Sequence, residues 1–589
     1  MDKHGQTRTT EEVFRPCPVR VRPCSSVFLP GGVKLTGRDS VPRIGHLEVP
    51  TNPREEVPLR SLSPRPSQRS TAIIPGLTAA LLACALLFAC GGTTPAPHSA
   101  APHAVNTANT THPVTVKPQA SWADGILYFV VLDRFADGDP ANDPPNTAGV
   151  DRNAKGTFHG GDLAGLRRQL DELADLGVTA LWITPVVKNI DGFVTGAGFP
   201  DWGYHGYWAD DFYSLDPRFG AEADLKALVD DAHRRGMKVL LDVVYNHAGY
   251  DSRYTKDPQF RGWMRTEGLG TCGADDVTSC VSGLPDFKTE RPEVADYLYK
   301  AHLGLAKRVG VDGFRLDTVK HVTHEFWQEH RRRVRAELGN DFFLIGEVWG
   351  GDAQSLDPWF AGDEMDAGFD FSFQGSTLGF VQGRGRTAAF DHYLKGRDKV
   401  RAGHLLSPYL SSHDVPGALF QLKGDKQLFR LAAALELTVS GLPMIYYGEE
   451  VGRPGGDWPD NRSDMPWGNR RIEPGAGKPR DEDLRSFYKK MIAIRRGHPA
   501  LSHGVYESVS SEGDLLVFRR RDAASKDAVI VAVNRGAQPA TASFDAPAEW
   551  EGRTAFDEVS GKRLTPAAGR IEAAVEPRGV AVIAAEPWR

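Results

Sequence analysis

From Trp122 onward, short apolar runs alternate with amphipathic stretches. The amphipathic stretches have helical spacing and include residues 162–176, 221–235, 292–308 and 324–338. The apolar runs read as strands and begin at Ile126, Val178, Lys238, Val311, Phe342, Met365, Leu405 and Leu442. Eight strands separated by helices favour a closed parallel (β/α)8 (TIM) barrel over an open doubly wound sheet. We expect this α/β domain to cover residues 122–500.

Two segments depart from this alternation. The stretch from His247 to about Asp286 is too long for an ordinary strand-to-helix loop, so it predicts a small inserted domain over residues 248–288, after the third strand. Beyond residue 501, apolar and polar positions alternate with a period of two, with turn residues between the runs. This pattern predicts a C-terminal antiparallel β-sandwich domain over residues 501–589.

The N-terminal part has a different composition. Residues 1–70 are rich in Pro, Arg and Ser and lack apolar periodicity, which indicates a disordered or mis-annotated leader. Residues 71–90 form an apolar run behind several arginines, as in a signal segment, and residues 91–121 have the composition of a flexible tether. We therefore expect export.

The apolar run ends in LFAC followed by two glycines, which resembles the lipobox of bacterial lipoproteins. That resemblance implies lipidation of Cys90 and a membrane-anchored lipoprotein at the cell surface or on the periplasmic side. The alternatives are a simple cleaved signal, which would give a secreted protein, and a stable transmembrane helix.

The remaining cysteines predict a disulfide, and the net charge bears on possible binding partners. Cys272 and Cys280 are the only cysteines after Cys90, and in an exported domain they can form a disulfide that clamps a short loop. A free pair or half of a metal site are the alternatives. The formal charge of −6 gives no indication of nucleic-acid binding, and we expect a monomer.

Polar residues mark the ends of several predicted strands, where a barrel of this kind builds its active site. They are Asp242, Asn246, His247, Arg315, Asp317, Glu347, His413 and Asp414. Several carboxylates in one cleft repel each other and are seldom kept for stability alone. Paired carboxylates suit glycoside hydrolysis, in which one attacks the anomeric carbon and a protonated one donates to the leaving oxygen.

Four segments make the resemblance to a known family specific. DVVYNH, GFRLDTVKH, GEVW and SSHD, which begin at Asp242, Gly313, Gly346 and Ser411, resemble the four signature segments of the α-amylase superfamily in order and spacing. GVTALWITP, LPDF and GLPMIYYGEE resemble its three auxiliary segments. The resemblance runs from about Ile126 to the C-terminus.

This resemblance implies roles for individual residues. Asp317 would be the nucleophile, Glu347 the general acid and base, and Asp414 the carboxylate that holds the sugar near the transition state. Arg315, on the same strand face as Asp317, can keep that carboxylate ionised. The expected substrate-binding residues are Tyr207, His247, Arg315, Lys320, His321, His413 and Arg462.

The resemblance also implies calcium. The Asn246 side chain, Asp286 and the His321 carbonyl would hold one ion between the barrel and the inserted domain. A second cluster resembles the additional calcium site of cyclodextrin glucanotransferases, with a solvated turn-rich loop as the alternative. It comprises Asp137, Asp139, Asn142, Asp143, Gly160 and Asp162.

Two positions differ from the family pattern. Ser412 stands where the family usually has Asn. Trp458 stands where an Asp usually precedes the substrate-binding arginine, here Arg462, by four residues, and Asp457 and Asp460 lie nearby in the chain. The expected activity is retaining hydrolysis of α-1,4-glucosidic bonds in starch-like glucans and maltooligosaccharides. The alternatives are an α-glucan transglycosylase and a maltogenic or cyclodextrin-degrading enzyme. A non-catalytic member would lack a catalytic carboxylate, and all three are present here.

Overall fold

The computed structural model describes residues 115–116, 121–143, 151–195, 198–265, 272–470, 472–566 and 570–585. The predicted leader, the signal segment with Cys90 and most of the tether lie outside these residues. Within the tether, the Val116 side chain is buried and its backbone N–H donates to the Arg235 carbonyl at 2.8 Å. Contacts with the barrel therefore begin before Trp122. Among the described residues, no helix is long and apolar enough to cross a membrane.

Eight parallel strands form the barrel, and all eight lie where the sequence predicts them. They are β1 (Leu127–Val130), β2 (Ala180–Ile183), β7 (Lys238–Val243), β8 (Gly313–Leu316), β9 (Phe343–Gly346), β10 (Ala367–Asp370), β11 (Leu405–Pro408) and β12 (Met444–Tyr446). Strands that follow each other in this order are paired, except β11 and β12, and β12 pairs with β1. A parallel bridge between Tyr409 and Met444 joins β11 to β12 and closes the ring.

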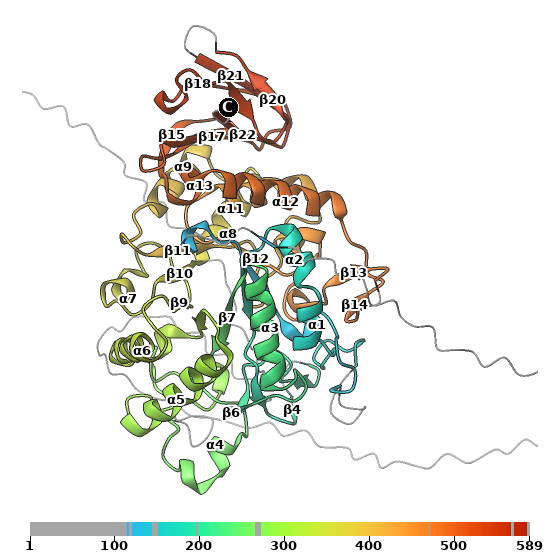
Figure 1. Cartoon of the computed structure of the whole chain (residues 1–589), viewed down its shortest axis with the longest axis vertical. Coiled ribbons are helices and arrows are strands. Elements are labelled where there is room, and N and C mark those ends of the chain that lie inside the picture. Colours follow the sequence, from blue (N-terminus) through green and yellow to red (C-terminus); the bar gives the residue numbers. More distant parts are fainter. Residues whose placement is uncertain are drawn as a thin grey trace, which may run out of the picture. The chain divides into compact units, whose positions relative to one another are not determined.

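Helices cover the outside of these strands (Figure 1). They include α1 (Leu163–Arg168), α2 (Leu170–Leu176), α3 (Glu222–Arg234), α5 (Pro292–Val309), α6 (His324–Glu337), α7 (Asp357–Ala361), α8 (Phe371–Val381), α9 (Thr387–Arg397), α10 (Ala418–Gln421) and α11 (Lys426–Thr438). Residues 162–176 form two helices rather than one, because the backbone at Gln169 (φ −99°, ψ 6°) leaves the helical range.

The ends of α5 illustrate how the sequence sets these helices. Pro292 occupies the first turn, where its missing N–H costs nothing. Gly310 adopts the left-handed conformation at φ 79° and closes the C-terminus with a hydrogen bond to the Ala306 carbonyl. Lys307 and Arg308 in the last turn complement the helix dipole.

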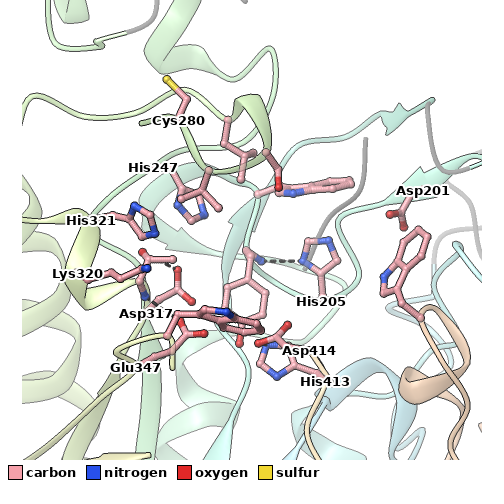
Figure 2. A pocket seen from close by; sticks show the side chains of 18 of the residues that line it. Asp201, His205, His247, Cys280, Asp317, Lys320, His321, Glu347, His413 and Asp414 are labelled. Carbon is pink, nitrogen blue, oxygen red and sulfur yellow. Dashed lines mark hydrogen bonds and ion pairs between the residues drawn. The ribbon is translucent and has the colours of Figure 1, made fainter. Parts of the chain in front are cut away.

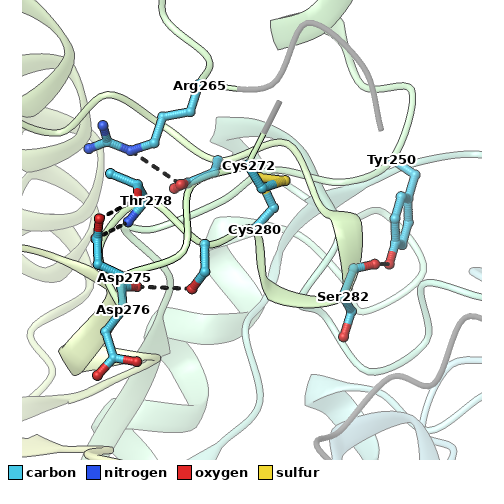
Figure 3. The surroundings of a disulfide bond; sticks show 10 residues. Tyr250, Arg265, Cys272, Asp275, Asp276, Thr278, Cys280 and Ser282 are labelled. Atoms are coloured by element: carbon cyan, nitrogen blue, oxygen red, sulfur yellow. Dashed lines mark hydrogen bonds and ion pairs between the residues drawn. A yellow bond between two sulfur atoms is a disulfide. The ribbon is translucent and has the colours of Figure 1, made fainter. Parts of the chain in front are cut away.

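Long connections follow two of the barrel strands. After β2, strand β3 (Val187–Asn189) pairs with β6 (Ala209–Leu215), and a small hairpin of β4 (Phe193–Val194) and β5 (Asp201–Trp202) lies between them in the chain. After β7, the predicted insertion contains the short helix α4 (Arg253–Lys256). Bridges His247–Asp286 and Met264–Phe287 tie its two arms together. The structure joins Cys272 to Cys280 in a disulfide within this segment (Figure 3).

The last part of the chain is the predicted antiparallel β sandwich. Strands β13 (Pro466–Gly468) and β14 (Gly475–Ala476) and helices α12 (Glu482–Gly497) and α13 (Pro499–His503) precede it. One sheet has the order β15-β16-β17-β22-β19-β20, and a second pairs β18 with β21. A buried cluster that includes Ile530, Phe544 and Ile571 forms their shared core. The strands are β15 (Val505–Glu512), β16 (Leu515–Asp522), β17 (Asp527–Asn534), β18 (Ala540–Asp545), β19 (Ala555–Asp557), β20 (Lys562–Leu564), β21 (Arg570–Val575) and β22 (Gly579–Ala585).

Candidate active site

A cavity of about 400 Å³ opens beyond the carboxyl ends of the barrel strands (Figure 2). His247 follows β7, Asp317 follows β8, Glu347 follows β9, and His413 and Asp414 follow β11. All five line the cavity, although they are spread over 168 positions of the chain. Barrel closure therefore brings together the residues that the signature segments single out. The other lining residues named by the sequence are Tyr207, Lys320, His321 and Arg462.

The Arg315 guanidinium holds three carboxylates at the floor of this site. Its Nη1 lies 3.0 Å from Asp242 Oδ1 and 2.6 Å from Asp317 Oδ1, and its Nη2 lies 3.0 Å from Glu347 Oε2. Arg315 is only 1% exposed, so water screens these interactions little. One positive charge faces three carboxyl groups, and this imbalance favours retention of a proton within the group.

Asp317 and Glu347 differ in how their ionised forms are supported. Asp317 accepts hydrogen bonds from Arg315 Nη1 and from the Thr318 hydroxyl, the latter at 3.1 Å. Burial raises the pKa of both carboxyl groups and Arg315 opposes it in both. The Asp414 charge further raises the pKa of Asp317, and the Asp317 charge further raises that of Glu347. The two carboxyl groups therefore influence each other through one guanidinium, an arrangement that favours one shared proton between them.

Thr318 links these two residues through an unusual backbone conformation. Its φ of 46° lies in the left-handed region, which costs a β-branched residue on the order of 1–3 kcal/mol. In this conformation its N–H donates to Glu347 Oε2 at 2.9 Å while its hydroxyl reaches Asp317. Thr318 could not be identified from the sequence, because the pattern of side chains carries no signal for a positive φ at threonine.

Tyr207 is held in place by Asp242. Its hydroxyl donates to Asp242 Oδ2 at 2.6 Å, and the Trp182 indole donates to the same oxygen at 2.9 Å. The preceding Gly206 has a φ of 90°, and a Cβ there would lie 2.1 Å from the Pro185 carbonyl oxygen. Only glycine allows this close approach, so it fixes the position from which the Tyr207 ring lines the cavity.

His247 and His413 are buried neutral imidazoles. Burial lowers the pKa of His247 to about 3, and burial with the charges of Arg462 and Arg315 lowers the pKa of His413 well below its usual range. Among the described residues, His247 Nε2 and His413 Nδ1 have no hydrogen-bond partner. The His413 ring stacks on Tyr207 at 5.2 Å. Two unpaired ring nitrogens beside an aromatic ring suit the hydroxyls and the apolar face of a sugar.

Arg462 lines the cavity and supports Asp414. Its Nε donates to the His413 carbonyl at 2.9 Å, and its Nη2 lies 3.4 Å from Asp414 Oδ1. The Ser412 hydroxyl accepts the Asp414 N–H at 3.1 Å. The acidic neighbour of Arg462 that the sequence left undefined is therefore Asp414 itself, and the Ser412 substitution supplies a turn that positions this carboxylate.

The disulfide loop forms part of the opposite wall. Cys280 lines the cavity (Figure 2), and Asp276 lies between the two cysteines in the chain (Figure 3). The Asp276 carbonyl lies 2.6 Å from His321 Nδ1, and its carboxylate lies 3.7 Å from Lys320 Nζ. The loop thus fixes two predicted substrate-binding side chains, a connection that the sequence did not indicate.

The residues predicted for the first calcium site converge in the structure. The Asn246 side-chain amide lies 3.0 Å from both Asp286 Oδ1 and the His321 carbonyl oxygen. If the amide nitrogen of Asn246 faces these two oxygen atoms, it donates a hydrogen bond to each. If the amide oxygen faces them, three oxygen atoms surround a common centre. The second arrangement is that of a cation site built from hard ligands. Asp286 Oδ2 also lies 3.2 Å from Arg265 Nε.

The second predicted calcium cluster contains a guanidinium. Arg152 Nη2 lies 2.8 Å from Asp137 Oδ2 and 3.3 Å from Asp143 Oδ2. Both oxygens of Asp162 accept hydrogen bonds, Oδ1 from the Gly138 and Gly165 amides and Oδ2 from the Asp139 amide and the Asn142 side chain. Gly160 adjoins Asp143. In this arrangement Arg152 supplies positive charge to the acidic loop, and the Asp162 lone pairs are engaged.

A closed (β/α)8 barrel with clustered carboxylates at its strand ends has the fold and site of a glycoside hydrolase. Residues 129–261 and 277–473 match the family described as alpha amylase, catalytic domain. A cyclomaltodextrinase from a Bacillus species is 32% identical over 444 residues, which cover 72% of this chain and 75% of that protein. Neopullulanase 2 of Thermoactinomyces vulgaris is 31% identical over 478 residues, 77% of each chain.

Solved structures agree with these matches. An α-amylase from Anoxybacillus superposes with a TM-score of 0.69 at 28% identity, covering 80% of this chain and all of that one. The chain therefore belongs to the α-amylase family and is a glycosidase.

Proposed function

We propose that this enzyme hydrolyses α-1,4-glucosidic bonds in glucans and maltooligosaccharides with retention of configuration. The observation that carries the proposal is the shared guanidinium of Arg315, which pairs with both Asp317 and Glu347 in one cavity and opposes the rise in pKa that burial causes in each. A retaining glycosidase needs a carboxylate nucleophile and a protonated acid in one site.

The chemistry follows from these two protonation states. Asp317 attacks the anomeric carbon while Glu347 gives its proton to the departing glycosidic oxygen, so a glycosyl ester forms and the C–O bond breaks. Glu347, now ionised, takes a proton from water, which attacks the same carbon and releases Asp317. Asp414, His247 and His413 hold the sugar hydroxyls, and the Tyr207 ring supports the sugar face.

Cyclic maltodextrins are a second candidate substrate. The similarity to the Bacillus cyclomaltodextrinase, which covers 72% of this chain, favours cyclic maltodextrins as substrates. This similarity supports the cyclodextrin-degrading alternative that the sequence left open.

Product analysis tests the proposal. Wild type should release reducing ends from maltoheptaose and soluble starch, and β-cyclodextrin tests the second candidate. Asp317→Asn should lower kcat by at least about 1,000-fold, because the amide cannot act as the nucleophile. Asp341→Asn, an exposed aspartate outside the cavity, is the matched control. Unchanged hydrolysis by Asp317→Asn would refute the assignment, and dominant transfer products would favour the transglycosylase.

One calcium ion belongs to this proposal as a structural element. Asn246, Asp286 and the His321 carbonyl would hold it, and it would tie the insertion to the barrel without entering the chemistry. The described residues contain no group of three His, Cys, Asp or Glu side chains arranged around a metal, so amide and main-chain oxygens would have to contribute. A second ion would have to displace Arg152, and we propose none.

Export also remains part of the proposal. The Cys272–Cys280 disulfide supports an oxidising compartment, as expected for an exported domain. Lipid attachment at Cys90 is tested by Cys90→Ala, which should move the protein from the membrane fraction to the soluble fraction.

A further inference from the structure

Asp201 occupies one end of the cavity and was not identified from the sequence. It begins β5, and its backbone pairs with Val194 of β4. The hairpin rests on the loop before α1, where the Trp202 N–H donates to the Gly156 carbonyl at 2.8 Å. Figure 2 places the Asp201 carboxylate beyond His205, on the side of the cavity away from Glu347 and Lys320.

The Asp201 carboxylate lacks a hydrogen-bond partner within the described part of the chain. Burial raises its pKa to about 6, and the charges of Arg462 and Arg134 only partly oppose this. Arg462 donates to the His413 carbonyl and pairs with Asp414. A partly buried carboxylate without donors, in a cavity that binds polyols, has its acceptor atoms available for a ligand.

Trp458 lines the same cavity and offers an apolar surface. Its ring stacks on Phe199 with centroids 5.5 Å apart and planes 24° from parallel, which restrains the indole. Trp458 stands at the position where the family usually has the aspartate that precedes the substrate-binding arginine. Asp201 brings a carboxylate to the same cavity from the β4–β5 hairpin.

The chemistry of the proposed reaction orients the cavity. Glu347 protonates the leaving oxygen, so the leaving group lies on its side, together with Lys320 and His321. The glycone extends the opposite way, toward Asp201 (Figure 2). Trp458 belongs to the same end of the cavity, because its ring stacks on Phe199, two residues before Asp201.

We propose that Asp201 and Trp458 bind a glucosyl unit of the glycone beyond the one that is cleaved, Asp201 through the sugar hydroxyls and Trp458 through its ring face. This inference rests on the proposed hydrolysis of α-glucans. It makes the enzyme selective for substrates with at least two glycone units, and it assigns that selectivity to a residue from a different loop than the family's usual aspartate.

The test compares 4-nitrophenyl α-maltoside, which has two sugar units, with 4-nitrophenyl α-glucoside, which has one. In Asp201→Ala, the ratio of kcat/KM for the maltoside to that for the glucoside should fall about 10- to 100-fold, the range for a hydrogen bond to a charged group. Asp201→Asn keeps one acceptor oxygen, so the same ratio should fall less in this variant. Trp458→Ala should lower the same ratio through lost stacking.

Asp191→Ala is the matched control, because Asp191 precedes the same hairpin and is exposed. Its ratio should equal that of wild type. An equal loss on both substrates in Asp201→Ala, or no loss, would overturn the inference, and an unchanged melting temperature separates a binding effect from misfolding. Wild type that cleaves neither substrate, nor maltoheptaose, would instead contradict the proposed function.

Discussion

Arg315 Nη1 lies 2.6 Å from Asp317 Oδ1. The two residues are on the same strand end, two positions apart, so the strand itself sets their geometry. Because the guanidinium also reaches Glu347, one side chain influences the protonation of both carboxyl groups on which the proposed reaction depends.

Replacing Arg315 should shift the pH profile upward. Arg315 lowers the pKa of Asp317 and of Glu347, so Arg315→Gln should raise both. Asp317 then ionises at higher pH, and Glu347 keeps its proton to higher pH. Both the acidic and the basic limb of the pH profile of kcat/KM should therefore shift to higher pH, by about one pH unit or more. Arg331→Gln, which removes a buried arginine that pairs with Asp366 instead, is the control. A profile that stays in place or moves down would contradict this account.

Removing the disulfide should weaken substrate binding more than it slows chemistry. In Cys272→Ser/Cys280→Ser, Asp276 loses its restraint and with it the positions of Lys320 and His321. We expect KM for maltoheptaose to rise about 3- to 10-fold with kcat nearly unchanged, and the free energy of unfolding to fall by about 2 kcal/mol. Reduction of wild type should reproduce both effects. A loss confined to kcat would show that the loop acts on the carboxylates instead.

A histidine after α12 should make stability depend on pH. His498 Nδ1 lies 3.3 Å from Asp527 Oδ1 and Nε2 lies 3.4 Å from Glu558 Oε1, and these carboxylates raise the pKa of His498 to about 9 against burial. Because the pKa of His498 is higher in the folded state than in the unfolded state, where it is near 6.5, protonation of His498 stabilises the folded state. This contribution is fully present below pH 6.5 and is lost as the pH rises through about 9.

His498→Gln should therefore cost about 1–3 kcal/mol of unfolding free energy at pH 6 and much less at pH 9.5. Urea denaturation at the two pH values measures this difference. His392→Gln alters an exposed histidine and should leave both values near those of wild type. A penalty that is the same at pH 6 and pH 9.5 would show that packing, not charge, explains the effect.

Calcium removal should destabilise wild type but not a variant without the Asn246 ligand. EGTA should lower the melting temperature of wild type by several degrees, because a bound ion stabilises only the folded state. Asn246→Leu should melt lower and respond little to EGTA. Asn340→Leu, at an exposed position, should respond as wild type does. A wild-type melting temperature that does not change on addition of EGTA would contradict the proposed calcium ion.

The barrel strands were predictable because buried parallel strands appear as uninterrupted apolar runs between turn signals, as at Val178 and Phe342. The break at Gln169 was not, because helical periodicity continues through it. Asp201 was missed for a different reason: it carries no motif, and it reaches the cavity only through the β4–β5 hairpin.

The sequence by itself determined the eight strands, the antiparallel terminal domain and the identities of the residues at the strand ends, because these depend on local periodicity and on residues adjacent in the chain. Only the tertiary structure decided what those residues contact. Arg315 shared among three carboxylates, Asp276 against His321, and Asp201 beside an arginine that is already engaged all join residues from separate segments. Such contacts arise when the barrel closes and its long connections pack above it, so their distances are set by packing, which a linear pattern does not encode.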